Sequence, residues 1–90
     1  MKITITAQMK GENEVMLRIA AAFQGAENNS GASQAAARDS FQHSFADAIN
    51  AGFKWNAGSM CYDATCQATP EACSPFAAYA NDKNLEIIQL

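Results

Sequence analysis

The side chains that could bind a metal ion or move protons fall into two small groups, and the first combines two acids with a histidine. Asp39, His43 and Asp47 follow one another at intervals of four residues, a spacing that places side chains in a row along one side of a helix. Such a row could bind a divalent metal ion or act as an acid and a base. The alternative is a solvated helix face on which the carboxylates stabilise protonated His43. No further ligand follows at a fixed spacing, which favours the solvated face.

The second group consists of Cys61, Cys66 and Cys73, which lie within thirteen residues. A structural zinc site generally has four ligands, and His43 would have to supply the fourth from a distant part of the chain. One disulfide, with one thiol left over, is the alternative in an oxidising compartment. Because the N-terminal residues do not follow the pattern of a secretory signal, we expect a cytoplasmic protein with reduced thiols. The sequence therefore predicts neither a metal nor a cofactor.

Common catalytic motifs are missing from the sequence. It contains no G-x-S-x-G, no P-loop, no dinucleotide-binding glycine pattern and no H-E-x-x-H. With a single histidine, a nucleophile and its base would also need an orienting group that no motif identifies. We therefore expect a protein that is not an enzyme.

The charge composition argues against two classes of partner. Six basic and nine acidic residues give a net charge of −3, whereas nucleic-acid binders need clustered lysines and arginines. No apolar run reaches the roughly 18 residues of a membrane-spanning helix. We expect neither direct nucleic-acid binding nor membrane association.

Charge is sparse in residues 48–81, which carry three charged side chains but contain the only tryptophan and both tyrosines. A charge-poor, aromatic surface is typical of the centre of a protein interface. The alternative is that this stretch supplies much of the core of a small domain. On the first interpretation, the candidate partner-binding residues are Lys54, Trp55, Tyr62 and Tyr79.

Hydrophobic periodicity predicts the elements of the first half of the chain. Strict alternation over residues 2–9 predicts a half-buried strand. Apolar side chains three and four residues apart predict a helix over 13–24, and a turn follows at 25–31. A longer helix is predicted over 32–51, with Gly52 as its stop.

In the second half, two short runs flank a turn that contains Gly58, which predicts a hairpin over residues 53–62. A capping residue before Pro70 predicts a short helix over 70–81. The last six residues, 85–90, have the composition of a strand.

These elements predict a single α+β domain over residues 1–90. Its small sheet should include the N- and C-terminal strands as neighbours. The helices at 13–24 and 32–51 should pack on one face as the two main helices, and the helix at 70–81 should be a short third one.

The sequence favours a non-catalytic protein-binding module with a protein partner such as a host complex. By analogy of class, small acidic proteins of phages and mobile elements often inhibit host machinery, anti-CRISPR proteins among them. One alternative is a homo-oligomeric structural or accessory subunit, dimeric through an edge strand. A second alternative is a metal-binding protein that uses His43 with nearby carboxylates or cysteines.

Overall fold

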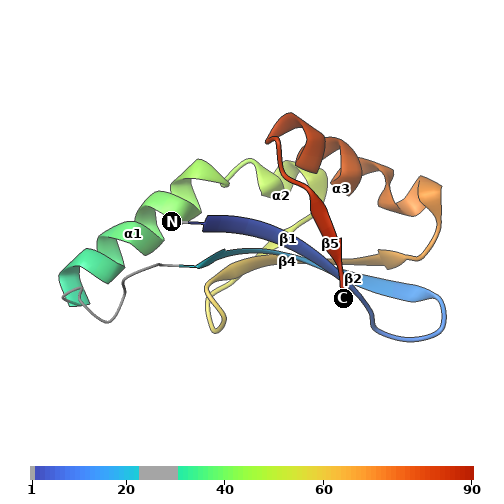
Figure 1. The fold of residues 1–90 in the computed structure, drawn as a ribbon, viewed down its shortest axis with the longest axis horizontal. Helices are drawn as coiled ribbons and strands as arrows, with labels where there is room; N and C mark the ends of the chain where they lie inside the picture. The colour runs from blue at the N-terminus through green and yellow to red at the C-terminus, as the bar shows by residue number, and fades with distance from the viewer. Residues whose placement is uncertain (1, 23–30) are drawn as a thin grey trace.

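The computed structural model describes residues 2–22 and 31–90. Within these ranges the chain forms a five-stranded mixed sheet with helices on one face (Figure 1), which confirms the predicted α+β class. In chain order the elements are β1 (Lys2–Met9), β2 (Glu14–Ala22), α1 (Gly31–Ser44), α2 (Ala48–Ala51), β3 (Lys54–Asn56), β4 (Cys61–Gln67), α3 (Pro70–Asp82) and β5 (Ile87–Gln89).

The strands lie in the order β3-β4-β2-β1-β5. Neighbouring strands run antiparallel except for β5, which runs parallel to β1 and places Ile87 opposite Ile5. The predicted pairing of the first and last strands is therefore confirmed. Because β5 pairs only with β1, it forms one edge of the sheet, and β3 forms the other.

The predicted helix over residues 13–24 is wrong, because residues 14–22 form strand β2. Apolar residues in this segment satisfy both a helical spacing and an alternating one. Val15, Leu17 and Ile19 alternate and are buried, and β2 lies between β1 and β4 with backbone pairing on both sides. Two hydrogen-bonded neighbours and a buried alternating face outweigh the weak local preference for a helix.

The predicted helix over 32–51 is divided in two, because α1 ends at Ser44 and α2 begins at Ala48. At the break, the hydroxyl of Tyr62 donates to the backbone carbonyl of Gln42 at 2.7 Å. This bond satisfies a carbonyl oxygen in the last turn of α1, where a helix lacks its own donors. The predicted stop at Gly52 is confirmed by its left-handed φ of 114°.

The remaining predictions for the second half are confirmed. Strands β3 and β4 form a hairpin, and α3 begins at Pro70 behind Thr69, whose hydroxyl accepts the amide N–H of Ala72 at 3.2 Å. With 13 residues, α3 joins α1 as a main helix and the four-residue α2 is the short one. The predicted turn at 25–31 lies outside the described residues except for Gly31, which begins α1.

One hydrophobic core fills the space between the sheet and the helices. Its largest fully buried side chains include Phe41 of α1, Phe53 before β3 and Tyr62 of β4. The rings of Phe41 and Tyr62 meet edge to face with centroids 6.0 Å apart, a favoured aromatic geometry. The charge-poor stretch 48–81 thus supplies much of the core, as the second interpretation of its composition expected.

The helices of residues 2–22 and 31–90 are all too short or too polar to cross a membrane.

Candidate binding surface

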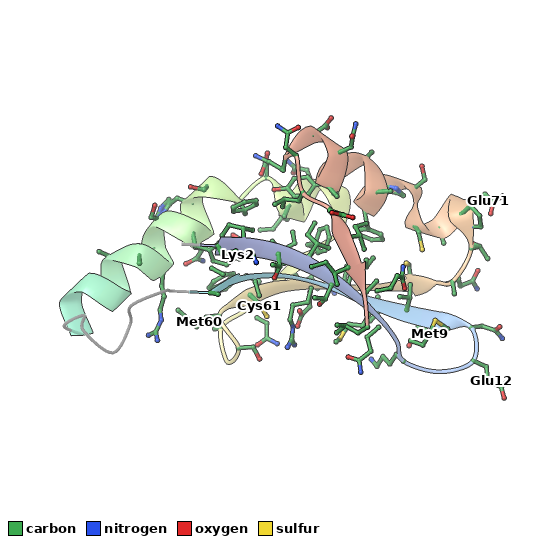
Figure 2. All side chains as sticks on the ribbon, in the orientation of Figure 1. Lys2, Met9, Glu12, Met60, Cys61 and Glu71 are labelled. Atoms are coloured by element: carbon green, nitrogen blue, oxygen red, sulfur yellow. The ribbon has the colours of Figure 1, made fainter. Side chains whose placement is uncertain are left out.

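Helices cover only one face of the sheet, and the opposite face lies away from all three of them (Figures 1 and 2). Strand alternation assigns side chains to the two faces. This uncovered face carries neutral polar, charged and apolar side chains from all five strands. They are Lys2, Thr4, Thr6, Gln8, Glu14, Met16, Arg18, Ala20, Ala22, Lys54, Asn56, Cys61, Asp63, Thr65, Gln67 and Ile88.

An ion pair between Arg18 of β2 and Asp63 of β4 occupies the centre of the uncovered face. Arg18 Nε lies 2.7 Å from Asp63 Oδ1, and Arg18 Nη2 lies 3.0 Å from Asp63 Oδ2. The two residues are direct neighbours in the pairing of β2 with β4, which gives this two-point contact its geometry. Because the guanidinium donates to the carboxylate, the pKa of Asp63 lies below its usual value and that of Arg18 above.

Two further side chains donate to the Asp63 carboxylate. Asn56 Nδ2 donates to Oδ2 at 3.0 Å, and the Cys61 thiol donates to Oδ1 at 3.4 Å. Asn56 Oδ1 in turn accepts a hydrogen bond from the amide N–H of Ser59 at 3.1 Å. This bond connects the turn between β3 and β4 to the side chains around Asp63. Four donors therefore hold one carboxylate, and the centre of the face is a rigid, internally satisfied cluster.

Cys61 is the one thiol on the uncovered face of the described residues, where Figure 2 shows it on the side of the sheet away from α3. It is only 1% exposed. Burial, together with the nearby Asp63 carboxylate, raises the pKa of the Cys61 thiol to about 11. Since the thiolate is the reactive form, Cys61 is a weak nucleophile at neutral pH.

An open groove of about 610 Å³ crosses the uncovered face beside the ion pair. Lys10 and Lys54 stand along it, and Met16 and Thr65 are among the side chains between them. A smaller hollow of about 210 Å³ shares Lys10 and Met16 and extends toward Gln8 on β1. The groove is lined by amide, hydroxyl, ammonium, carboxylate, indole and thioether groups, which suits hydrogen bonding to another surface.

The four predicted partner-binding residues do not gather at one place. Lys54 is exposed on the uncovered face, and both Lys54 and Trp55 line the groove. Trp55 is half-buried and packs on the ring of Tyr62 with centroids 4.8 Å apart. Tyr62 and Tyr79 are core residues, 1% and 8% exposed. Of the four, only Lys54 and Trp55 therefore belong to the groove.

The predicted row of Asp39, His43 and Asp47 does not form, because α1 ends before Asp47. His43 is exposed, and its Nδ1 contacts the backbone oxygen of Asp39 at 2.8 Å. The carboxylate of Asp47 accepts the Tyr79 hydroxyl at 2.7 Å and contacts Lys83 Nζ at 3.0 Å. These two partners hold the pKa of Asp47 below its usual value, the Tyr79 bond being the larger cause.

The three cysteines are divided between the two faces of the sheet. Cys61 lies on the uncovered face, whereas Cys66 lies on the helix side with its sulfur 3.3 Å from that of Cys73. His43 lies neither at Cys61 nor at the pair formed by Cys66 and Cys73. Among residues 2–22 and 31–90, no three histidine, cysteine or acidic side chains are arranged to hold a metal ion.

Sequence reasoning missed the centre of the candidate surface. Arg18 and Asp63 are 45 positions apart, and no local pattern connects residues at such a separation. Interpreting 14–22 as a helix also concealed the fact that Met16 and Arg18 share one face of a strand. The alternation of Val15, Leu17 and Ile19 was the signal that could have revealed it.

No family model, curated protein or solved structure matches this chain.

Proposed function

We propose that this chain is a non-catalytic protein-binding module that contacts its partner through the uncovered face. The observation that carries the proposal is that the potentially reactive groups of that face are already hydrogen-bonded or buried. Its central carboxylate, Asp63, already accepts four hydrogen bonds, and its thiol, Cys61, has a pKa of about 11. Cys61 stays a thiol at neutral pH rather than the nucleophilic thiolate, and the Asp63 carboxylate, although ionised, is a weak base whose oxygens are already hydrogen-bonded.

Neutral polar groups are the largest class of side chain on the contact surface that we propose. Threonine, glutamine and asparagine side chains share the face with the ion pair, and such groups form hydrogen bonds with a partner without a large desolvation cost. Lys10 and Lys54, which make no ion pair among the described residues, line the groove, with Lys54 on the edge strand β3 opposite Asp63. Charges at the rim of an interface change the association rate more than the affinity. We therefore expect partner affinity to depend only weakly on salt.

A module of this kind acts by occupying a surface of a larger protein assembly. Its small size and its grooved contact face are compatible with blocking a host complex, as inhibitors from phages and mobile elements do, anti-CRISPR proteins among them. This part of the proposal rests on analogy of class. We place the module in the cytoplasm, a reducing compartment in which structural disulfides are rare, and all three of its cysteines are free.

The test is affinity capture from a lysate of the cells in which the chain is naturally made. Gln8 and Thr65 are exposed on the uncovered face, so Gln8→Arg with Thr65→Arg should block contact while leaving the core intact. The matched control is Ser74→Arg with Ala78→Arg, two exposed positions of α3 on the other side of the molecule. Both double variants add the same charge, so they differ only in the face they alter.

We expect the same proteins to be captured by the wild type and the α3 control and to be lost with the variant of the uncovered face. Capture that survives the Gln8→Arg and Thr65→Arg pair, or capture lost equally with both pairs, would overturn the proposal. Replacing Trp55 and Tyr62 would be a poor test, because both side chains pack in or against the core.

A second candidate function, a homodimeric subunit, is favoured by the free edge of β5. This strand pairs with β1 on one side only, and an unpaired edge can add the strand of a second copy. Its side chain Ile88 is 45% exposed and Leu90, just beyond it, is 74% exposed. An antiparallel pair of β5 strands would extend the sheet across two copies and cover both residues.

Light scattering over a range of concentrations tests this candidate. We expect a dimer that dissociates on dilution and that becomes monomeric when Ile88 is replaced by lysine. A wild-type protein that is monomeric at every concentration removes the candidate without affecting the proposal for the uncovered face.

A further inference from the structure

Two cysteines from different elements meet on the helix side of the sheet. Cys66 of β4 and Cys73 of α3 are both half-buried, and their sulfur atoms lie 3.3 Å apart. This separation is more than an ångström longer than the roughly 2.05 Å of an S–S bond, so both are thiols.

Backbone contacts fix the position of each cysteine. Cys66 lies opposite Val15 in the pairing of β4 with β2. The amide of Cys73 donates to the carbonyl of Thr69 at 3.0 Å, and Pro70 occupies the first turn of the same helix. Because the chain on both sides is held in regular structure, the proximity of the two sulfurs is built into the fold.

We propose that Cys66 and Cys73 form a dithiol site that a small-molecule disulfide, of the glutathione type, converts into an intramolecular disulfide. The thiolate of one cysteine attacks the small disulfide, forms a mixed disulfide and releases one small thiol. The other cysteine loses its proton to solvent and attacks the protein sulfur of the mixed disulfide, releasing the second small thiol. The protein loses two protons and two electrons, and the small disulfide, which gains two of each, becomes two small thiols.

The environment of Cys66 assigns the order of these attacks. Burial is the main cause that raises the pKa of the Cys66 thiol to about 11, and the neighbouring Cys73 and the carboxylate of Glu14 add to it. Cys66 therefore remains protonated at neutral pH and is a poor first nucleophile. We therefore assign the first attack to Cys73 and the displacement of the small thiol to Cys66.

The disulfide would join the end of β4 to the first turns of α3 and leave the uncovered face unchanged. Thr65 and Gln67, the neighbours of Cys66, point to the opposite face of the sheet. Oxidation is therefore expected to raise the resistance of the protein to denaturant, because a cross-link restricts the unfolded chain. This inference does not depend on the proposed binding function.

The experiment incubates the reduced protein with oxidised glutathione at mildly alkaline pH and counts free thiols by alkylation under denaturing conditions. All three cysteines are free before oxidation, and we expect one to remain afterwards, with a loss of about 2 Da and no retained glutathione. Cleavage after Asp63 and Glu71 puts the three cysteines on different peptides, so the peptides that contain Cys66 and Cys73 should stay joined until a reductant is added. The urea midpoint of the oxidised protein should be higher than that of the reduced one.

Three variants identify the sulfurs. Cys61→Ser is the matched control and should still form the cross-link, whereas Cys73→Ser should not. Cys66→Ser should retain glutathione on Cys73, because no resolving thiol is present. Three alkylated thiols after oxidation, a persistent glutathione adduct on the wild type, or a link that includes Cys61 would overturn the proposal. The wild-type peptide map decides the matter even if a variant fails to fold.

Discussion

The phenolic hydroxyl of Tyr62, on β4, donates a 2.7 Å hydrogen bond to the backbone carbonyl oxygen of Gln42, in the last turn of α1. One side chain of the sheet thus satisfies a carbonyl at the point where the helix stops. The ring of the same residue, only 1% exposed, packs against Phe41. Tyr62 therefore fixes both the position and the end of α1.

Replacing Tyr62 with phenylalanine keeps the ring and removes this bond. Because the carbonyl is left in a partly buried place, we expect the free energy of unfolding to fall by about 1–2 kcal/mol. Tyr79→Phe is the matched control. Its partner, the carboxylate of Asp47, is 52% exposed and can bind water instead, so the loss should be smaller. Urea denaturation of both variants measures the difference, and equal losses would contradict the role given to Gln42.

The pairing of Asp63 with Arg18 predicts a pH-dependent contribution to stability. The pKa of Asp63 is lowered in the folded protein, so its contribution is present above the ordinary carboxyl pKa of 3.8 and is lost as pH falls below it. Since the two side chains are 21% and 36% exposed, water limits this contribution to on the order of 1 kcal/mol.

We therefore expect Asp63→Asn to be less stable than the wild type at pH 7 and to approach the wild type as the pH falls toward about 2. Urea midpoints measured at both pH values provide the test. Glu86→Gln, at an exposed position with no ion pair among the described residues, should change stability little at pH 7. A deficit of Asp63→Asn that is the same at both pH values would show that the charge of Asp63 is not its source.

Among the described glycines, Gly52 has the least room for a side chain. Its φ is +114°, and a Cβ atom there would lie 3.1 Å from Cε1 of the buried Phe76 ring. Strained backbone and close packing together should make Gly52→Ala less stable by about 1–3 kcal/mol. Gly11→Ala is the control, because its Cβ would meet nothing within 4 Å. Thermal unfolding of both variants tests this, and similar melting temperatures would exclude the proposed strain.

The helix cap at Thr69 gives a prediction for α3. Its hydroxyl accepts the N–H of Ala72, one of the amides that a helix start leaves without an internal partner. We expect Thr69→Ala to reduce the free energy of unfolding by about 1 kcal/mol. Thr65→Ala, on the exposed uncovered face, should have a smaller effect. If the urea midpoints of the two variants coincide, the cap does not stabilise α3.

The sequence predicts an element correctly where only one pattern of periodicity or capping fits the segment. The alternation of β1, the cap and proline at the start of α3 and the glycine after α2 each depend on a few adjacent residues, and the structure agrees with all three. The segment 14–22 fits both a helix and a strand, and only its two neighbours in the sheet decide between them. The break before Asp47 likewise depends on Tyr62 and Tyr79, which are distant in sequence.

The candidate surface was harder to predict than the fold for the same reason. Composition identified the charge-poor stretch and, within it, Lys54 and Trp55, which do line the groove. Aromatic type alone could not separate interface residues from core residues, and both tyrosines are in the core. Arg18 and Asp63 come together only through the register of β2 with β4.

The alternation of β4 has a consequence for how this protein can diversify. Tyr62 and Ala64 are buried in the core, while Asp63 and Thr65, between and beside them, face the opposite way. One short strand therefore carries core residues and residues of the proposed contact face in alternation. Exposed residues such as Thr65 can change without loosening the core, whereas inserting or deleting a single residue would exchange the two faces of the strand.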